Sequence, residues 1–358
     1  MNLDDYRKKI DTLDEQIVRL LNERTNAAAE IGKLKEKDAA AVYVPAREKA
    51  VFERVARLNQ GPLTESNVRA IYREIMSASL SLETDMKVAF LGPASTYTHQ
   101  AAQSRFGTSV EYIPCQHISE VFTNVQQGRT QYGVVPIENS IEGHVTATQD
   151  ELGQTPLKIC AEIYHSIDHC LLTRFSSDDI QRIYSHPQGL AQCRNWLKTH
   201  MPKAELHETT STAQAAEIAA NEPNSAAIAS ALAGQQHELH TIGSGIQDVG
   251  MNVTRFLVMG KSYGPQTGED KTSIHFAVKH EVGALVNALG VFEKSELNLL
   301  SIESRPSRTK QWEYFFFVDF EGHAKGEATR VALKEIMNHC MVMTVLGSYP
   351  KSPRVEGW

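Results

Sequence analysis

A regular seam of large side chains at the start of the chain narrows the possible folds more than any other feature. Its positions alternate spacings of three and four residues without a break: Leu3, Tyr6, Ile10, Leu13, Ile17, Leu20, Arg24, Ala27, Ile31 and Leu34. This spacing predicts one long helix whose seam packs against another helix. Two shorter helices are predicted to follow, one after Pro45 and one after Thr64, with Gly61 and Pro62 separating them.

One member of the seam, Arg24, is charged. A buried arginine is costly unless an anion pairs with it. Either its side chain extends outward or meets a carboxylate such as Glu23 or Glu48, or the seam encloses a site for an anionic ligand.

The length and charge of the chain limit its domain number and partners. A chain of 358 residues predicts two or three domains. A net charge of −7 gives no general attraction to nucleic acid or to anionic membranes, and no apolar run reaches the length of a membrane span. Residues 1–30 are charged throughout, unlike a secretory signal, and the five cysteines are scattered. We therefore expect a cytoplasmic protein with reduced thiols.

The segment 3–83 contains Arg7, Arg24, Gly32–Lys35, Arg47, Glu48, Ser79 and Glu83 at positions that resemble those of the all-helical chorismate mutases. The resemblance implies that Arg7, Arg24 and Lys35 bind the two carboxylates of chorismate and that Glu48 binds its ring hydroxyl. Lys35 and Glu83 would hold the ether oxygen. The implied substrate-binding residues of the mutase are Arg7, Arg24, Lys35, Arg47, Glu48, Ser79 and Glu83.

Two positions depart from the mutase pattern. Val44 stands where the best-known form of the family has an acidic contact to the hydroxyl, so Glu48 has less help, and Arg47 would orient it. Glu83 stands where Gln is common. The rearrangement is pericyclic and needs only a held conformer and stabilised charge on the ether oxygen. Since Glu83 donates only when protonated, we expect burial to raise its pKa.

Helix geometry bears on assembly. At a rise of about 1.5 Å per residue, Arg24 and Lys35 are about 16 Å apart along the helix, a span that two long side chains can bridge. Arg7 is about 25 Å from Arg24, which is too far for one small ligand. If Arg7 serves the site, it comes from another chain, and an interlocked helical dimer follows.

The central part of the chain alternates strands, polar turns and helix starts. In the segment Tyr132–Leu152 a short buried strand leads into Asn139 and Ser140, which either cap a helix or help to bind an anion at its N-terminus. Similar turns recur near Ser95, Ser185, Thr210 and Ala229. The alternation predicts α/β units with ligand-facing turns at the strand ends.

Five motifs in this region, VAFLGPASTYT, GVVPIENSIEGHV, YSHPQGLAQC, TSTAQAA and NVTRFLVMG, strongly resemble prephenate dehydratase over residues 87–262. The resemblance implies a two-lobed fold like that of periplasmic binding proteins, with an essential Thr254 in the interlobe cleft. Ser95 stands where this family usually has Gly. The expected substrate-binding residues of the dehydratase are Ser95, Thr96, Thr98, Asn139, Ser140, Gln188, Ser211, Thr212, Thr254, Arg255 and Phe256.

Dehydration of prephenate removes the ring carboxylate and the 4-hydroxyl together. The enzyme must donate to the departing hydroxyl and leave the carboxylate free to go. Thr254 is a donor but a poor proton source. Glu138 either serves as general acid with a raised pKa, or orients Asn139 or caps the turn.

Neither a cofactor nor a metal is expected. Gly243 and Gly245 lack the third glycine of a dinucleotide fingerprint. The pair His237 and His240 is one residue short of a zinc-binding H-E-x-x-H helix. His165 and His169 alternate with apolar residues, which indicates packing or surface positions.

The C-terminal part follows a polar linker, Ser262–Asp270, and its pattern predicts the split ferredoxin-like order βαββαβ. Two of its motifs, Gly283–Val286 and Glu303–Pro306, resemble the ACT regulatory domain of the dehydratases, and so does the run WEYFFFVDFEGH. The resemblance implies that these motifs bind phenylalanine at a subunit interface and inhibit the enzyme. The implied phenylalanine-binding residues are Gly283, Ala284, Leu285, Val286, Asn298, Glu303, Ser304, Arg305 and Pro306.

The expected fold is therefore an all-α helical mutase domain at 1–85, a two-lobed α/β dehydratase domain at 86–265 and an α+β ACT domain at 271–350. We expect a bifunctional enzyme, at least a homodimer, that converts chorismate to prephenate and then to phenylpyruvate, with feedback inhibition by L-phenylalanine. A fusion of mutase with prephenate dehydrogenase is disfavoured because the chain has no dinucleotide fingerprint. An alternative hypothesis is a two-lobed amino-acid sensor that kept its ligand sites and lost catalysis. Only an assay of enzyme activity distinguishes it from the preferred hypothesis.

Overall fold

The computed structural model describes residues 2–37, 43–83, 85–306 and 314–352. The chain forms two compact units. The first, helical unit comprises residues 1–87 and 103–111, and the second comprises residues 88–102 and 112–358. No helix in the described part of the chain combines the length and the apolar character needed to cross a membrane.

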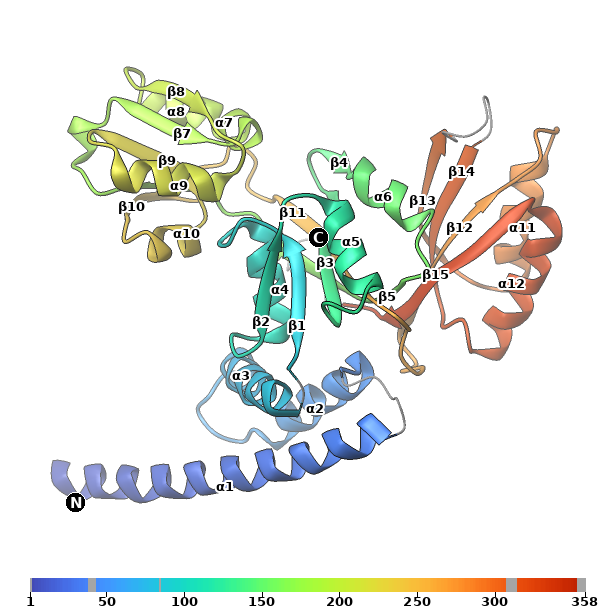
Figure 1. The fold of residues 1–358 in the computed structure, drawn as a ribbon, viewed down its shortest axis with the longest axis horizontal. Coiled ribbons are helices and arrows are strands. Elements are labelled where there is room, and N and C mark those ends of the chain that lie inside the picture. Colours follow the sequence, from blue (N-terminus) through green and yellow to red (C-terminus); the bar gives the residue numbers. More distant parts are fainter. Residues whose placement is uncertain (1, 38–42, 84, 307–313, 353–358) are drawn as a thin grey trace. The chain divides into compact units, whose positions relative to one another are not determined.

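Three helices make up most of the helical unit, as predicted: α1 (Leu3–Lys37), α2 (Pro45–Leu58) and α3 (Glu65–Glu83) (Figure 1). Val51, Val55 and Val68 form the buried core between α2 and α3. Gly32 of α1 lies against α3 so closely that an added Cβ would be 3.1 Å from the Cβ of Glu83. The α1 and α3 helices therefore pack face to face at this end of α1.

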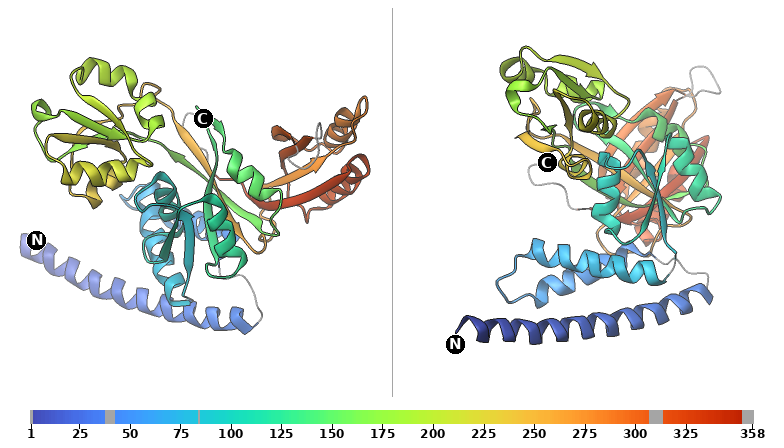
Figure 2. Two further views of the ribbon diagram at one scale, coloured as in Figure 1. Left: turned by 45° about the horizontal axis from the view of Figure 1, so that its top comes forward. Right: turned by 60° about the vertical axis from the view of Figure 1, so that its left-hand side comes forward.

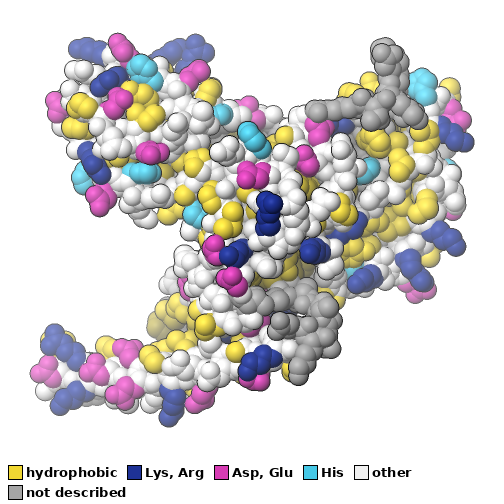
Figure 3. Space-filling view, viewed as in Figure 1, with side chains coloured by type: hydrophobic (Ala, Val, Ile, Leu, Met, Phe, Trp, Pro, Cys, Tyr) yellow, Lys and Arg dark blue, Asp and Glu magenta, His cyan; other side chains and the backbone are white. Residues whose placement is uncertain are grey.

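The apolar seam of α1 is not buried within one chain. Its large side chains from Leu3 to Leu34 are 46–65% exposed. Figure 3 shows hydrophobic side chains between charged ones along this helix. Surface apolar residues in such a continuous row mark a binding surface.

The segment 103–111 is held on α3. It contains the last turn of α4 (Tyr97–Phe106), which Gly107 ends with a φ of +73°, a value that favours glycine. An added Cβ at Gly107 would lie 2.4 Å from the Cβ of Ser77. The backbone N–H of Ser109 donates to Ser77 Oγ at 3.0 Å, and the Thr108 hydroxyl donates to Glu74 at 2.6 Å.

The second unit contains a large mixed sheet in the order β13-β14-β12-β15-β5-β11-β3-β1-β2, with β4 beside β3. Every residue of its strand β11 is buried between β3 and β5, which pair with it antiparallel. The helices α5 (Ile118–Gln126) and α6 (Thr146–Leu152) lie against strand β3 of this sheet. Its strands are β1 (Lys87–Leu91), β2 (Glu111–Cys115), β3 (Tyr132–Asn139), β4 (Gly143–His144), β5 (Lys158–Ser166) and β11 (Val253–Gly260).

A separate five-stranded sheet in the order β10-β6-β9-β7-β8 forms a second lobe. The predicted α/β alternation appears as parallel pairing of β7 with β8 and with β9. The chain passes between the two sheets twice, at residues 167–169 and 245–252 (Figure 2). The elements of this lobe are β6 (Cys170–Thr173), η1 (Ser177–Asp179), β7 (Arg182–Ser185), α7 (Pro187–Gln192), α8 (Arg194–His200), β8 (Glu205–Glu208), α9 (Thr212–Asn221), β9 (Ser225–Ala229), α10 (Ala231–Gln236) and β10 (His240–Ser244).

The C-terminal elements follow the predicted βαββαβ order, and their strand order β13-β14-β12-β15 is that of a ferredoxin-like sheet. Phe276, Phe292, Phe320 and Ile336 lie in the core between this sheet and its two helices. Trp312, the first residue of the run WEYFFFVDFEGH, lies outside the described residues. The elements are β12 (Asp270–Ala277), α11 (Ala284–Lys294), β13 (Leu299–Pro306), β14 (Tyr314–Glu321), α12 (Glu327–His339) and β15 (Val342–Pro350).

One glycine permits β15 to join the larger sheet. Gly347 pairs with Ile159 of β5 in parallel register. An added Cβ at Gly347 would lie 2.2 Å from the carbonyl oxygen of Ile159. Since no side chain fits at this distance, the strand pairing depends on glycine here.

Candidate active sites

Four residues predicted for the mutase meet in pairs between α1 and α3. Arg24 donates through Nη1 to the hydroxyl of Ser79 at 2.7 Å. Lys35 Nζ lies 3.7 Å from Oε2 of Glu83. Arg24 therefore contacts a hydroxyl in this structure, and neither of the two carboxylates considered for it in the sequence.

The electrostatics of Glu83 agree with the predicted direction. Its side chain is only 9% exposed. Burial raises the pKa of Glu83, while the nearby charges of Lys35 and Arg24 act in the opposite direction and do not cancel it. A carboxyl group with a raised pKa retains its proton, and hence its capacity to donate, to a higher pH.

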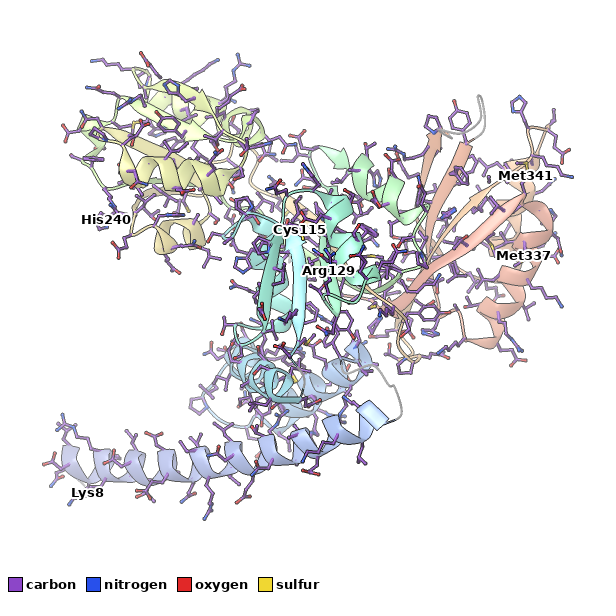
Figure 4. All side chains as sticks on the ribbon, viewed as in Figure 1. Lys8, Cys115, Arg129, His240, Met337 and Met341 are labelled. Carbon is purple, nitrogen blue, oxygen red and sulfur yellow. The ribbon has the colours of Figure 1, made fainter. Side chains whose placement is uncertain are left out.

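Arg7 lies apart from this group of residues. It pairs with Asp4 at 3.3 Å in the first turns of α1, and its side chain is 67% exposed. Figure 4 labels its neighbour Lys8 close to the N-terminal end of the helix. Because α1 is one continuous helix, Arg7 remains about 25 Å along the axis from Arg24.

Glu48 has a different set of neighbours. Its Oε2 accepts a hydrogen bond from the Tyr43 hydroxyl at 2.7 Å and lies 3.0 Å from Nη2 of Arg105. Arg47, expected to orient Glu48, is exposed. The Glu48 side chain itself is 11% exposed.

A cavity of about 520 Å³ lies between the two sheets of the second unit. Hydroxyl and amide side chains from both lobes face it. Two helices, α4 and α9, begin at its wall, and free backbone N–H groups at helix starts favour anions. Eight residues predicted for the dehydratase line it: Thr96, Thr98, Asn139, Gln188, Ser211, Thr212, Thr254 and Phe256.

Two predicted serines support this wall without lining it. Ser95 is buried, has a φ of +63° and bonds through its hydroxyl to Gln236. That φ lies in the left-handed region, which explains why a glycine suits this position. Ser140 Oγ accepts from the backbone N–H of Val253 at 3.0 Å and so fixes the start of β11.

Two other predicted residues, Glu138 and Arg255, lie on the opposite face of the sheet from the cavity. Side chains alternate along strands, and Asn139 is paired with Thr254 while Glu138 is paired with Arg255. Glu138 Oε1 is 3.9 Å from Nε2 of His144, which does line the cavity. The structure therefore gives no direct path from Glu138 to a ligand, and the general-acid alternative loses its geometric support.

The hydrogen-bond direction at Thr254 follows from the backbone. The N–H groups of Ile141 and Glu142 both donate to Oδ1 of Asn139 at 3.0 Å. Since a backbone N–H cannot accept, the other end of this amide is the NH₂ group. That group donates to Oγ1 of Thr254 at 2.8 Å and to Oδ1 of Asn252 at 2.7 Å. The Thr254 oxygen therefore accepts from Asn139, and its own hydrogen is left to point elsewhere.

The same reasoning extends the network to His169. Asn252 accepts through Oδ1, so its NH₂ group donates to Oε1 of Gln192 at 2.9 Å. His169 Nε2 lies 2.9 Å from the same oxygen and must carry a hydrogen. Burial lowers the pKa of His169, which favours the neutral ring with its hydrogen on Nε2. Nδ1 lies 3.1 Å from the Tyr97 hydroxyl, which donates to the carbonyl oxygen of Asp168 at 2.8 Å. His169, expected at a packing or surface position, is buried against Tyr97 and also lines the cavity.

Arg255 belongs to a buried ionic cluster that joins β11 and β5 to the C-terminal elements. Its guanidinium lies 2.9 Å from Glu162 and 2.7 Å from Asp319, and Lys271 lies 2.7 Å from Glu162. Burial alone would raise the pKa of Asp319, but the charges of Arg255 and Lys271 hold it below its ordinary value. Burial and the Arg255 charge lower the pKa of Lys271. The predicted substrate contact of Arg255 is therefore replaced by ion pairs.

Two residues of the predicted phenylalanine motifs contact the dehydratase elements. Glu303 Oε2 lies 3.3 Å from Nε2 of His144, and Arg305 pairs with Asp150 of α6 at 2.6 Å. Gly283 precedes α11 with a φ of +80°, a conformation that favours glycine. The remaining predicted positions lie at the start of α11 (Ala284, Leu285, Val286), just before β13 (Asn298) and within β13 (Ser304, Pro306).

Some cavity residues escaped the sequence reasoning. Asn252 is the first residue of the NVTRFLVMG motif, and Gln192 lies near the end of the YSHPQGLAQC motif. Their hydrogen bond joins residues 60 positions apart in the sequence, so neither motif alone predicts it.

In the described part of the chain, no group of three metal-binding side chains occurs, and Figure 4 places the exposed His240 at the outer edge of its lobe.

The fold is therefore a helical unit with paired basic and polar side chains between α1 and α3, followed by a two-lobed α/β unit with a polar cavity. Family comparisons agree. The chorismate mutase type II family matches residues 6–84, and the prephenate dehydratase family matches residues 88–263.

Whole-chain relatives carry both modules. A bifunctional chorismate mutase/prephenate dehydratase of Aquifex aeolicus (strain VF5) is 47% identical over 355 residues and covers 98% of each chain. Another, from Pseudomonas aeruginosa, is 42% identical over 353 residues and covers 97% of each. The crystal structure of an Arthrobacter aurescens prephenate dehydratase in complex with L-Phe has a TM-score of 0.69 and 32% identity, covering 75% of this chain and 92% of that one. The chain belongs to the family of bifunctional chorismate mutase/prephenate dehydratases and has both enzyme activities.

Proposed function

We propose that the two reactions occur at separate sites, the rearrangement between α1 and α3 and the dehydration in the cavity beside Thr254. The predicted boundaries, 1–85 and 86–265, divide the chain accordingly. The hydrogen-bond direction at Thr254 carries the proposal for the second site. The product of the first site, prephenate, is the substrate of the second.

At the mutase site, Arg24 and Lys35 bind the carboxylates of chorismate. Protonated Glu83 and Lys35 stabilise the negative charge that develops on the ether oxygen. The raised pKa of Glu83 supports its role as a donor. Ser79, which already contacts Arg24, contributes a hydroxyl next to the bound ligand.

The mutase site is completed by a second chain. Arg7 cannot reach Arg24 along its own helix, so the Arg7 that serves the site belongs to a partner. The exposed apolar seam of α1 supports this arrangement, because an interlocked pair of such helices would bury it. We therefore propose at least a homodimer.

At the dehydratase site, Thr254 donates a hydrogen bond to the 4-hydroxyl of prephenate as that group departs, and keeps its own proton. The Asn139 amide donates to the hydroxyl oxygen of Thr254, and the hydroxyl hydrogen of Thr254 therefore points into the cavity. The helix starts at α4 and α9, with Thr96, Thr98, Ser211 and Thr212, hold the carboxylate of the side chain. Loss of carbon dioxide forms the aromatic ring, and one proton from the medium converts the departing hydroxide to water.

Feedback by L-phenylalanine acts through the ACT domain, residues 271–350. The L-Phe complex of the Arthrobacter relative supports binding of this amino acid. Glu303 and Arg305 lie in a predicted phenylalanine motif and also contact His144 and Asp150. A ligand that moves β13 would therefore act directly on the dehydratase elements. We place the enzyme in the cytoplasm.

The test is a two-step assay on the purified chain. Chorismate is added and its loss is followed together with the appearance of phenylpyruvate, first alone and then with L-phenylalanine. The proposal predicts that both signals appear and that phenylalanine suppresses the keto acid. Absence of keto acid from added prephenate would refute the second site, and insensitivity to phenylalanine would refute the feedback alone.

A further inference from the structure

The most informative neighbour of Glu48 comes from outside the mutase family match. Arg105 lies in the last turn of α4, within the residues that match prephenate dehydratase, yet it belongs to the helical unit. Its Nη2 is 3.0 Å from Glu48 Oε2, and its Nε donates to the hydroxyl of Tyr43. Arg105, Tyr43 and Glu48 therefore form a closed triangle of polar contacts.

Aromatic contacts support this triangle at its buried corner, Tyr43. Tyr43 is 5% exposed, and its ring lies 4.9 Å from that of Phe106, centroid to centroid. The Arg105 guanidinium lies 5.8 Å from the centroid of the Tyr43 ring, in cation–π range. Beyond Phe106, Gly107 is held against α3, so the turn that carries Arg105 has little freedom.

Tyr43 and Arg105 act on the same carboxylate oxygen, the first as a hydrogen-bond donor and the second as an ion-pair partner. The described contacts of Glu48 fall on Oε2, and a carboxylate has about four acceptor positions on two oxygens. A carboxylate fixed through one oxygen presents the other in a defined direction. Burial and the Glu48 carboxylate also raise the pKa of Tyr43, which keeps its hydroxyl protonated and donating.

We propose that Arg105 and Tyr43 are positioning residues of the mutase reaction, which hold Glu48 so that its free oxygen accepts the ring hydroxyl of chorismate. This inference rests on the proposed role of Glu48. It supplies the help that the chain lacks at Val44, where the family's acidic contact is absent. It also means that the mutase site depends on a residue of the dehydratase sequence.

The test uses the full chain and measures both activities of each variant, with prephenate supplied directly for dehydration. Arg105→Met should lower mutase kcat/KM about 10- to 100-fold, the range for a misplaced binding group, and leave dehydration within twofold. Arg105→Lys should recover part of the loss because it restores a charge but not the forked geometry. The matched control is Arg54→Met, which removes an exposed arginine of α2.

A double-mutant cycle separates positioning from general support of the fold. In a Glu48→Gln background, Arg105→Met should change mutase kcat/KM less than threefold, because the group it positions is already altered. An equal loss in both backgrounds, or wild-type mutase activity in Arg105→Met, would overturn the inference. If Arg105→Met does not fold, Tyr43→Phe is put through the same cycle with the same criteria. Wild-type mutase activity in Glu48→Gln alone would refute the proposed role of Glu48 instead.

Discussion

Replacement of Asn139 by Asp tests the hydrogen-bond direction at Thr254 with almost no change in shape. In the wild-type chain the Asn139 amide donates to Thr254 at 2.8 Å. An ionised carboxylate can only accept, so the Thr254 hydrogen would turn toward it and away from prephenate. Hydrogen bonds to charged groups contribute about 1.5–3 kcal/mol, and this bond would have to break before Thr254 could donate to the substrate.

The expected effect combines that cost with the loss of a donor in the transition state. Removal of one such donor typically lowers kcat by about 10²–10³. We therefore expect Asn139→Asp to lower dehydratase kcat by about 10²–10³, measured as phenylpyruvate formed from saturating prephenate. Mutase activity of the same preparation should stay within twofold and serves as the control for folding.

The pH profile and a double variant provide two further tests of the assigned hydrogen-bond direction. A protonated carboxyl group can donate again, so dehydratase kcat of Asn139→Asp should rise as the pH falls through the pKa of the introduced group. The double variant with Thr254→Ala should be no slower than Thr254→Ala alone. Dehydratase kcat within threefold of wild type in Asn139→Asp would refute the assigned direction.

Three further predictions concern other parts of the chain. Mutase turnover should fall as the pH rises through the raised pKa of Glu83, and Glu83→Gln should flatten the profile; an unchanged profile in that variant would contradict the donor role. Arg255→Met should lower the free energy of unfolding by about 3–5 kcal/mol in denaturant titrations, because it leaves the buried Glu162 and Asp319 carboxylates with too little positive charge. Gly347→Ala should separate β15 from β5 and lower thermal stability in calorimetry, whereas an unchanged melting temperature would show that the junction relaxes at little cost.

The helical start and the order of elements could be predicted because both follow from local pattern. The three-and-four spacing from Leu3 to Leu34 predicts a helix, and the structure has α1 over Leu3–Lys37. The alternation of side chains along β3 is equally local. The sequence pattern places Glu138 and Asn139 in a polar turn after the strand, whereas β3 extends to Asn139, so their side chains point to opposite faces of the sheet.

Other features depend on contacts between distant parts of the sequence. The partnership of Arg105 with Glu48 joins helices whose sequences show no shared pattern. His169 alternates with apolar residues like a packing histidine, and only its contact with Gln192 reveals a different role. Arg255 follows Thr254 directly, so its place in a motif suggested a substrate contact, while the partners that bury it lie in β5 and the C-terminal strands.

The division of the two reactions between two sites is tested most directly by the product balance of Thr254→Ala. Chorismate is supplied to the purified full-length variant, and chorismate, prephenate and phenylpyruvate are quantified over time. We predict that chorismate disappears at the wild-type rate while prephenate accumulates in equal amount and phenylpyruvate formation falls by at least about 10². Loss of both reactions, or continued formation of phenylpyruvate at the wild-type rate, would contradict the account.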